Sequence, residues 1–355
     1  MSTASAGWDR SARALWSARG PGAALARGAL LLPAAAYRIA VAIRNAAYDT
    51  GVLRSRPLPL PAVGVGNLAV GGAGKSPLAR WIAVELGARG ARVGLLLRGY
   101  GGDEVLEHRE ALPGVVVVAD ADRRRGALEA ARAGADALVL DDCLQHRRVA
   151  PDLMLAVVAA ESAAAPRWPL PAGPWREGRS ALARADAVVV TRKSAGEAEA
   201  RALAESLRRR TRRGLGLVAA LTPTRLAPLA GGAARPLGEA LAGRRVLAVC
   251  GIGAPEAFAS QLRAAGAASV ELAGFGDHHA YSDADVTAIR RMGGAHDLVV
   301  TTAKDAVKLR ALWPSDPPAC HVALLDVGLG PDRALLSGLL DEVLARSRPS
   351  TTRDW

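Results

Sequence analysis

The chain has few cysteines and few aromatic residues. Its three cysteines, Cys143, Cys250 and Cys320, lie far apart and form no CxxC pair. This spacing argues against a disulfide framework and a cysteine zinc site, and it fits a reducing compartment. Two phenylalanines and four tyrosines are too few for the base-stacking surface of a single-strand binder. We therefore expect no nucleic-acid partner.

The chain also lacks a long uninterrupted apolar run. The most apolar stretch near the start, residues 23–45, is interrupted by Arg27, Arg38 and Arg44, whereas a membrane span needs about 20 apolar residues. The late start of this run and Pro33 within it argue against a cleaved signal peptide. Seven arginines and two aspartates give residues 1–54 a net charge of +5. This pattern favours a helix lying on an anionic membrane surface over the alternative, a helix packed on the protein core.

The chain contains enough apolar residues to fold, and it has more basic than acidic residues. Hydrophobic residues make up 50% of the 355 residues and charged residues 23%, which predicts a folded protein of two domains. The net charge of +12 is compatible with nucleic acid, an anionic membrane or acidic small molecules. Only four of the 46 basic residues are lysines, Lys75, Lys193, Lys304 and Lys308. A lysine within a glycine-rich loop therefore indicates that this position specifically requires a lysine.

Short apolar runs alternate with helix-like stretches along most of the chain. Six runs between residues 61 and 192 and four between 244 and 328 read as buried parallel strands. This alternation predicts an α/β fold with a doubly wound, mostly parallel sheet of the P-loop NTPase type and a second, smaller α/β domain. We expect a membrane-associating segment over 1–50, the P-loop domain over 51–195, a second domain over 196–345 and a flexible tail over 346–355. Residues 221–236, rich in Pro, Ala and Gly, read as a loop.

The strongest chemical pattern is VGVGNLAVGGAGKSPLARW, residues 63–81. An apolar strand leads into a glycine-rich turn and then into a helix, the order of a phosphate-binding loop. Its candidate nucleotide ligands are Gly71, Gly72, Ala73, Gly74, Lys75 and Ser76. Backbone N–H groups of the turn would face phosphate oxygens, Lys75 would reach the β and γ phosphates, and Ser76 would place its hydroxyl on Mg²⁺. Ala69 stands where the strict GxxxxGK[ST] pattern has glycine.

Two aspartates follow a predicted buried strand in ALVLDD, residues 137–142. Asp141 and Asp142 could hold Mg²⁺ beside the loop, as a P-loop site requires, or could cap the next turn. Three further segments, RGYGGDE (98–104), DDCLQHRR (141–148) and PLPAGPWREGRSAL (169–182), carry acidic, basic and amide side chains. They provide candidate groups for an acceptor molecule, because transfer needs a base near the acceptor hydroxyl and cations for anionic groups.

These motifs, together with FGDHHAYSDAD (275–285) and TTAKDAVKL (301–309), occur in an order that resembles the tetraacyldisaccharide 4'-kinase family over about residues 20–340. The resemblance implies transfer of the γ-phosphate of ATP to the 4'-hydroxyl of a tetraacylated glucosamine disaccharide 1-phosphate, with Mg²⁺. It implies a peripheral protein at the cytoplasmic face of the bacterial inner membrane, and we expect a monomer. The alternative is a P-loop switch or partitioning ATPase, which needs no small-molecule acceptor.

Roles for individual residues follow from the same resemblance. Asp103 corresponds to the group that receives the acceptor proton, His278 to the histidine paired with it, and Lys75 to the catalytic lysine. The resemblance assigns Ser76, Glu104, Asp141 and Asp142 to the metal. It places five side chains around the substrate: Tyr100, Arg123, Gln145, Arg176 and Glu177.

The chain departs from the family pattern at four points. Ser76 replaces a threonine, Cys143 replaces the glycine of DDGLQH, and Ala303 replaces the glutamate of TEKDAVK. The loop that separates RGYGG from GDE is absent, so the two motifs are fused at residues 98–104. This fusion bears directly on the position of Asp103.

Overall fold

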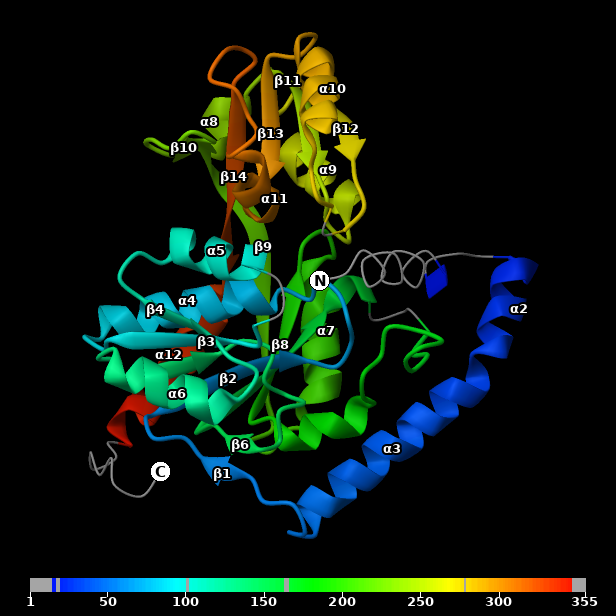
Figure 1. Cartoon of the computed structure of the whole chain (residues 1–355), viewed down its shortest axis with the longest axis vertical. Helices are drawn as coiled ribbons and strands as arrows, with labels where there is room; N and C mark the ends of the chain where they lie inside the picture. The colour runs from blue at the N-terminus through cyan, green and yellow to red at the C-terminus, as the bar shows by residue number, and fades with distance from the viewer. Residues whose placement is uncertain (1–14, 17–19, 100–101, 163–165, 278, 347–355) are drawn as a thin grey trace.

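The computed structural model describes residues 15–16, 20–99, 102–162, 166–277 and 279–346. The side chains of Pro21, Ala23 and Asp103 lie outside this description. The described part forms two lobes stacked along the longest axis, with a helical arm extending from the lower lobe (Figure 1).

The lower lobe contains a mostly parallel sheet in the order β4-β3-β5-β2-β7-β8-β9. Its strands are β2 (Ala62–Asn67), β3 (Val93–Leu97), β4 (Val116–Ala119), β5 (Ala137–Leu140), β7 (Leu153–Ala159), β8 (Ala187–Arg192) and β9 (Leu215–Pro228). Short β1 (Arg56–Pro57) pairs with β6 (Val149–Ala150) beside it. The central strands are buried along almost their whole length, which explains why their sequences are continuous apolar runs.

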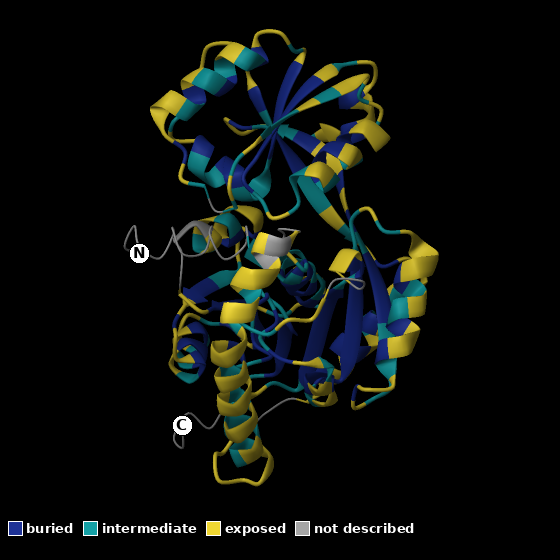
Figure 2. Ribbon diagram, turned by 90° about the vertical axis from the view of Figure 1, so that its right-hand side faces the viewer, coloured by how far each residue is buried: buried dark blue, intermediate teal, exposed yellow. Residues whose placement is uncertain are grey.

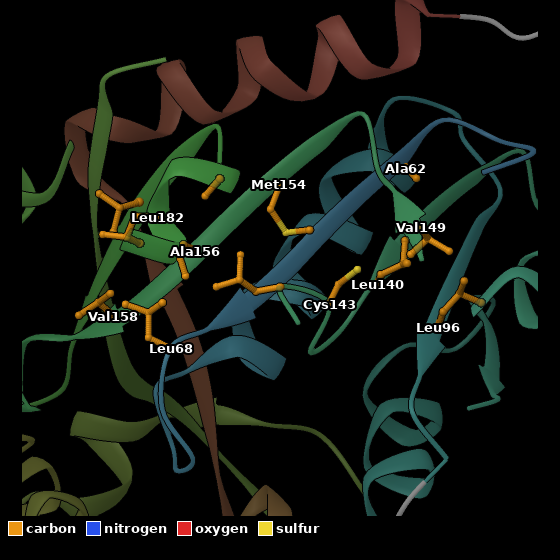
Figure 3. Packing of buried hydrophobic residues seen from close by; sticks show 14 of the residues in the cluster. Ala62, Leu68, Leu96, Leu140, Cys143, Val149, Met154, Ala156, Val158 and Leu182 are labelled. Carbon is orange, nitrogen blue, oxygen red and sulfur yellow. The ribbon is translucent and has the colours of Figure 1, made fainter. Parts of the chain in front are cut away.

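Helices cover both faces of this sheet. Helices α4 (Lys75–Ala88) and α12 (Arg333–Ala345) pack on one face, and α6 (Arg123–Arg132) and α7 (Glu197–Arg208) pack on the other. Helix α5 (Gly102–Ala111) follows β3, and the 3-10 helices η1 (Ala160–Ser162) and η2 (Arg179–Arg184) follow β7 and precede β8. Figure 3 shows Leu140 and Cys143 packed with Met154 in the core between the sheet and the α6–α7 layer. The doubly wound sheet expected from the sequence is confirmed.

The upper lobe is a second α/β sandwich. Its strands are β11 (Arg245–Cys250), β12 (Ser269–Gly274), β13 (Leu298–Thr302) and β14 (Cys320–Gly328), with β10 (Arg235–Pro236) on the edge of β9. Helices α8 (Leu237–Leu241) and α9 (Pro255–Ala264) pack on one face, and α10 (Asp283–Gly293) and α11 (Ala303–Leu309) pack on the other. A 3-10 helix, η3 (Gly330–Asp332), leads from β14 back to α12.

Strand β9 joins the two lobes and corrects the sequence-based expectation of a loop over 221–236. Its first half pairs in parallel with β8 and its second half antiparallel with β14, so a single 12-stranded sheet runs through the described part of both lobes (Figure 1). The register shifts where Pro223 and Arg225 pair with consecutive residues of β14, which leaves Thr224 as a bulge. The prolines that argued against a strand are tolerated because one flanks this bulge and the other, Pro228, ends the strand.

The hydrophobic cores divide the chain differently from the expected ranges. Side chains of α7 and α12 belong to the lower-lobe cores, although both helices fall within the 196–345 range. The upper-lobe cores contain residues between Leu226 and Leu324. The physical reason is that β14 returns the chain to the lower lobe, where α12 covers the sheet next to α4.

Helices α2 (Pro21–Ala29) and α3 (Leu31–Asp49) form the arm. Only Ala34 of α3 is buried, and Figure 2 shows the helix lying along the outside of the lower lobe with most of its surface exposed. Leu32, Ile39 and Ile43 are 83%, 60% and 66% exposed, and their spacing places them along one side of the helix. Within the described residues, no helix is both long and apolar enough to cross a bilayer.

Candidate nucleotide and metal site

The glycine-rich turn connects the end of β2 to the start of α4, as expected. Gly71 has φ 126° and Gly74 has φ 84°, backbone conformations that side chains rarely adopt. At Gly74 space is also limiting, because an added Cβ would lie 2.3 Å from Leu221 Cδ1. Helix α4 begins at Lys75 with Pro77 in its first turn. Its free N–H groups and positive dipole end therefore face the turn, which suits a bound anion.

Lys75 lies between two groups at the carboxyl edge of the sheet. Its Nζ donates to Asn67 Oδ1 at 3.1 Å and lies 3.4 Å from Asp142 Oδ1. Because β2 and β5 are parallel neighbours, their carboxyl ends place the loop beside the aspartate pair. The predicted meeting of Lys75 with the aspartates is thus present in the structure.

Asp142 is a carboxylate held between two cations, Lys75 and Arg176. Arg176 donates through one nitrogen to both of its oxygens at 2.8 Å. Burial raises the pKa of Asp142, but the charges of Lys75 and Arg176 outweigh burial and lower it to about 2. Asp142 also takes φ 56°, so the left-handed residue of this turn is the aspartate. Cys143 is fully buried in the core, which explains how a side chain is tolerated where the family has glycine.

Asp141 has the geometry of a metal ligand. It is 5% exposed, and its Oδ2 lies 3.5 Å from Nε2 of His108, while Oδ1 has no hydrogen-bond partner among the described residues. Burial raises the pKa of Asp141, but His108, Lys75 and the Ser76 hydroxyl together keep it below its usual value. An ionised, buried oxygen without a partner, next to a serine hydroxyl, fits the oxygen donors that Mg²⁺ prefers.

The described residues contain no cluster of three or more His, Cys, Asp or Glu side chains able to hold a metal ion alone. In nucleotide sites Mg²⁺ is held by one or two carboxylates and by the phosphates of the substrate. Ser76 and Asp141 therefore fit Mg²⁺ bound together with a nucleotide.

The loop after η1 runs alongside the glycine-rich turn. The Val70 N–H donates to Pro174 O at 2.7 Å, and the Arg176 N–H donates to Leu68 O at 2.8 Å. Gln145 completes the contact, because its Nε2 donates to Asn67 O at 2.9 Å. The structure thus brings Gln145 and Arg176 next to Lys75, as expected for one site.

Two other predicted substrate residues make structural contacts. Arg123 is 3% exposed and donates to Asp120 O at 2.8 Å and Asp141 O at 3.0 Å. Glu177 is 7% exposed and pairs with Arg44 of α3 at 2.9 Å and with Arg184. Arg123 therefore supports the backbone of the aspartate pair, and Glu177 attaches the arm to the loop beside the site.

Four predicted residues are described only in part or only by their exposure. Tyr100 and His278 lie outside the described residues, as does the side chain of Asp103. The backbone of Asp103 lies in the first turn of α5. Glu104 follows it and is exposed.

Two residues of the site, Asn67 and His108, were not predicted from the sequence. Asn67 is 1% exposed at the end of β2 and orients Lys75, and His108 is 1% exposed on α5 against Asp141. An asparagine that ends a buried apolar strand just before a phosphate loop could have been predicted to belong to the site. No local pattern predicts His108, because its contact with Asp141 depends on how α5 packs.

Comparisons with known proteins show which family the chain resembles. The model of the family described as "Tetraacyldisaccharide-1-P 4'-kinase" matches residues 27–109 and 101–345, two stretches that overlap at the fused segment. The tetraacyldisaccharide 4'-kinases of Anaeromyxobacter sp. (strain K) and Geobacter sulfurreducens are 40% and 35% identical, over 93% and 92% of this chain and 94% and 96% of theirs. A crystal structure of LpxK from Aquifex aeolicus in complex with ATP is 25% identical, with a TM-score of 0.67, over 90% of this chain and 99% of that one. These matches confirm the resemblance, and the chain belongs to the tetraacyldisaccharide-1-P 4'-kinase family.

Proposed function

We propose that this chain transfers the γ-phosphate of ATP to the 4'-hydroxyl of a tetraacylated glucosamine disaccharide 1-phosphate. The observation that carries the proposal is the convergence of Lys75, Ser76, Asp141 and Asp142 at one edge of the sheet, beside a turn preceding a helix. The family's printed activity and the ATP in the Aquifex aeolicus structure support the same reaction.

In this proposal the residues of 71–76 bind the triphosphate. The N–H groups at the start of α4 face the phosphates, and Lys75 exchanges its contact with Asp142 for phosphate oxygens. Arg176 keeps Asp142 ionised and fixed when Lys75 turns away. Ser76 and Asp141 would hold Mg²⁺, which would supply positive charge to offset that of the phosphates.

The acceptor side of the proposal depends on α5 and on the loop before α10. Asp103, in the first turn of α5, receives the proton of the 4'-hydroxyl, and His278 keeps that carboxylate ionised. Contacts of described neighbouring residues hold α5 and Asp277. His108 and Glu107 tie α5 to Asp141 and to Arg80 of α4 at 3.5 and 2.8 Å, and Asp277 accepts from Lys304 at 2.7 Å.

We also propose that the arm places the chain on an anionic membrane surface at the cytoplasmic face, as a monomer. Support comes from the exposed apolar stripe of α3 and from a cavity of about 620 Å³ between α3 and residues 167–169, which Arg38 and Arg167 line together with apolar side chains. An amphipathic lipid with phosphate groups matches this combination. Glu104, Gln145 and Tyr100 remain proposed contacts of the metal or sugar.

The direct test of the site is Lys75→Met, which keeps the length of the side chain and removes its charge. We expect turnover with ATP and the disaccharide 1-phosphate to fall by at least about 100-fold, because a charge aimed at the reacting phosphates is lost. Arg89→Met, at the other end of α4, is the matched control and should keep near-normal turnover. Near-normal turnover of Lys75→Met would refute the assignment of the loop.

A further inference from the structure

Three consecutive residues of the glycine-rich turn are held from outside by residues of β8 and β9 and by the residue that follows β8. Lys193 Nζ donates to Gly72 O at 2.8 Å, and Thr191 Oγ1 donates to Ala73 O at 2.8 Å. Gly74 lies against Leu221 of β9, as described above. Two carbonyls of the turn are thus bonded by side chains from outside it, while the Ala73 N–H donates within the turn to Gly71 O at 2.9 Å. These contacts fix the peptide groups of the turn.

Lys193 is itself firmly placed. It follows β8, and a single carboxylate oxygen of Glu161 accepts the backbone N–H groups of Lys193, Ser194 and Ala195 at 2.5 to 3.2 Å. Burial lowers the pKa of the Lys193 ammonium, while Glu161 and Asp277 act in the opposite direction. Its amine is therefore a fixed donor, unlike that of a solvated surface lysine.

The upper lobe contacts the backbone of Lys193 and of Leu221. Gln261 of α9 donates through Nε2 to Lys193 O at 3.1 Å and to Leu221 O at 2.7 Å. One side chain of the upper lobe thus bonds two of the three residues that contact the glycine-rich turn. An amide with two donor hydrogens is suited to this bridge between carbonyls.

We propose that Lys193 and Gln261 are positioning residues for ATP: Lys193 fixes the Gly72 carbonyl, and Gln261 fixes Lys193 from the upper lobe. The position of the upper lobe thereby sets the shape of the phosphate-binding turn. This inference rests on the proposed function only in assigning residues 71–76 to the triphosphate. It also accounts for a lysine at position 193 in a chain that otherwise uses arginine almost throughout.

The test measures the affinity of the full-length protein for a fluorescent ATP analogue with Mg²⁺ and without lipid, and then kcat and KM for ATP with lipid. We expect Lys193→Met to weaken binding and raise KM by about tenfold, the effect of losing one hydrogen bond from a charged donor. We expect kcat to change by less than about threefold, because the loss occurs before the chemical step. Lys193→Arg should recover most of the affinity.

Gln261→Ala supplies the second arm of the test. Alone it should raise KM in the same direction by a few fold, and in the double variant it should add little to Lys193→Met, because both act through one contact. Arg263→Met, on the same helix, removes a bond to Val270 O at 3.1 Å and should leave affinity unchanged. Unfolding midpoints show whether Lys193→Met folds. If it does not fold, the ATP affinities of Lys193→Arg and Gln261→Ala test the inference.

Wild-type ATP affinity in Lys193→Met would overturn the inference. It would also be overturned if the KM increase of the double variant equalled the product of the two single increases. An equal loss in Arg263→Met would overturn it as well. Failure of the proposed function has a different signature: a wild-type protein that binds the analogue but leaves the lipid unphosphorylated refutes the kinase assignment, while the binding data alone still decide the roles of Lys193 and Gln261.

Discussion

Asp142 combines a left-handed backbone with a carboxylate held between Lys75 and Arg176. Its fixed charge keeps the two cations close together without a ligand. When a triphosphate enters, Lys75 can turn to the phosphates while Arg176 remains on Asp142. The aspartate therefore pre-organises the site as well as stabilising it.

This ion pair predicts a pH dependence of the metal-free protein. The pKa of Asp142 lies at about 2, below its ordinary value of 3.8, so its contribution to stability is present above about pH 4 and is lost as the pH falls toward 2. The difference in unfolding free energy between wild type and Asp142→Asn should shrink by roughly 2 kcal/mol between pH 5 and pH 2. Denaturant titrations at several pH values measure it, and a constant difference would contradict the ion-pair account.

Gly74 gives a second prediction at this scale. Its φ of 84° and the distance of 2.3 Å from an added Cβ to Leu221 Cδ1 should make Gly74→Ala less stable by about 1 to 3 kcal/mol. Adding Leu221→Ala removes the clash but leaves the unfavourable backbone conformation. Gly74→Ala should therefore lower the free energy of unfolding less in the Leu221→Ala background than in wild type. An equal loss of stability in both backgrounds would show that the clash is absent.

Local sequence predicted those site residues whose roles are set by neighbours in the chain. The glycines, Lys75 and Ser76 form one continuous motif, and Asp141 and Asp142 end an apolar strand. His108 and Lys193 could not be found this way, because their partners, Asp141 and Gly72, are brought to them only by folding. Arg123 and Glu177 were found, but their ion pairs and backbone contacts depend on the packing of distant segments.

At the scale of elements, α3 is the least buried long helix of the described part. Its exposed stripe of Leu32, Ile39 and Ile43 would be costly to leave in water but is suited to a lipid interface. Glu177 and Arg147 attach the helix to the lower lobe, through Arg44 at 2.9 Å and Asp49 at 2.6 Å. The stripe is therefore held in a fixed position relative to the site.

Replacing two residues of the stripe tests its role. The double change Leu32→Glu and Ile43→Glu should reduce binding to vesicles containing anionic phospholipid by at least about fivefold, because two apolar side chains no longer enter the interface. Val84→Glu places the same charge at another exposed apolar position, 56% exposed on α4, and should bind like wild type. Unchanged sedimentation of the double variant with vesicles would exclude the stripe as the docking surface.

Strand β9 shows where reading elements from sequence fails. Its first half is an apolar run, but two prolines and a glycine-rich continuation favoured a loop over its second half. The bulge at Thr224 and the pairing with β14 are tertiary features that no local pattern reveals. Strands that are buried on both faces, such as β2 and β7, were predicted because their apolar runs are continuous.

At the scale of the whole molecule, a shared sheet, the Gln261 bridge and an ion pair between Arg310 of α11 and Glu110 of α5 connect the lobes. The nucleotide loop lies in the lower lobe, and Asp277 and Lys304 lie in the upper one. Alternation of strands and helices predicted two α/β units, but not that one strand belongs to both. A transferase benefits from this arrangement because donor and acceptor groups on two lobes can be brought together away from water.

The most direct test of the central claim follows the terminal phosphate of ATP. The purified chain is incubated with γ-labelled ATP, Mg²⁺ and the tetraacylated disaccharide 1-phosphate in mixed micelles, and label is measured in lipid and in inorganic phosphate. We predict that the label appears on the lipid at the 4'-position, with little free phosphate when lipid is omitted. Release of inorganic phosphate at the same rate with and without lipid, and no labelled lipid, would contradict the account and favour a P-loop ATPase.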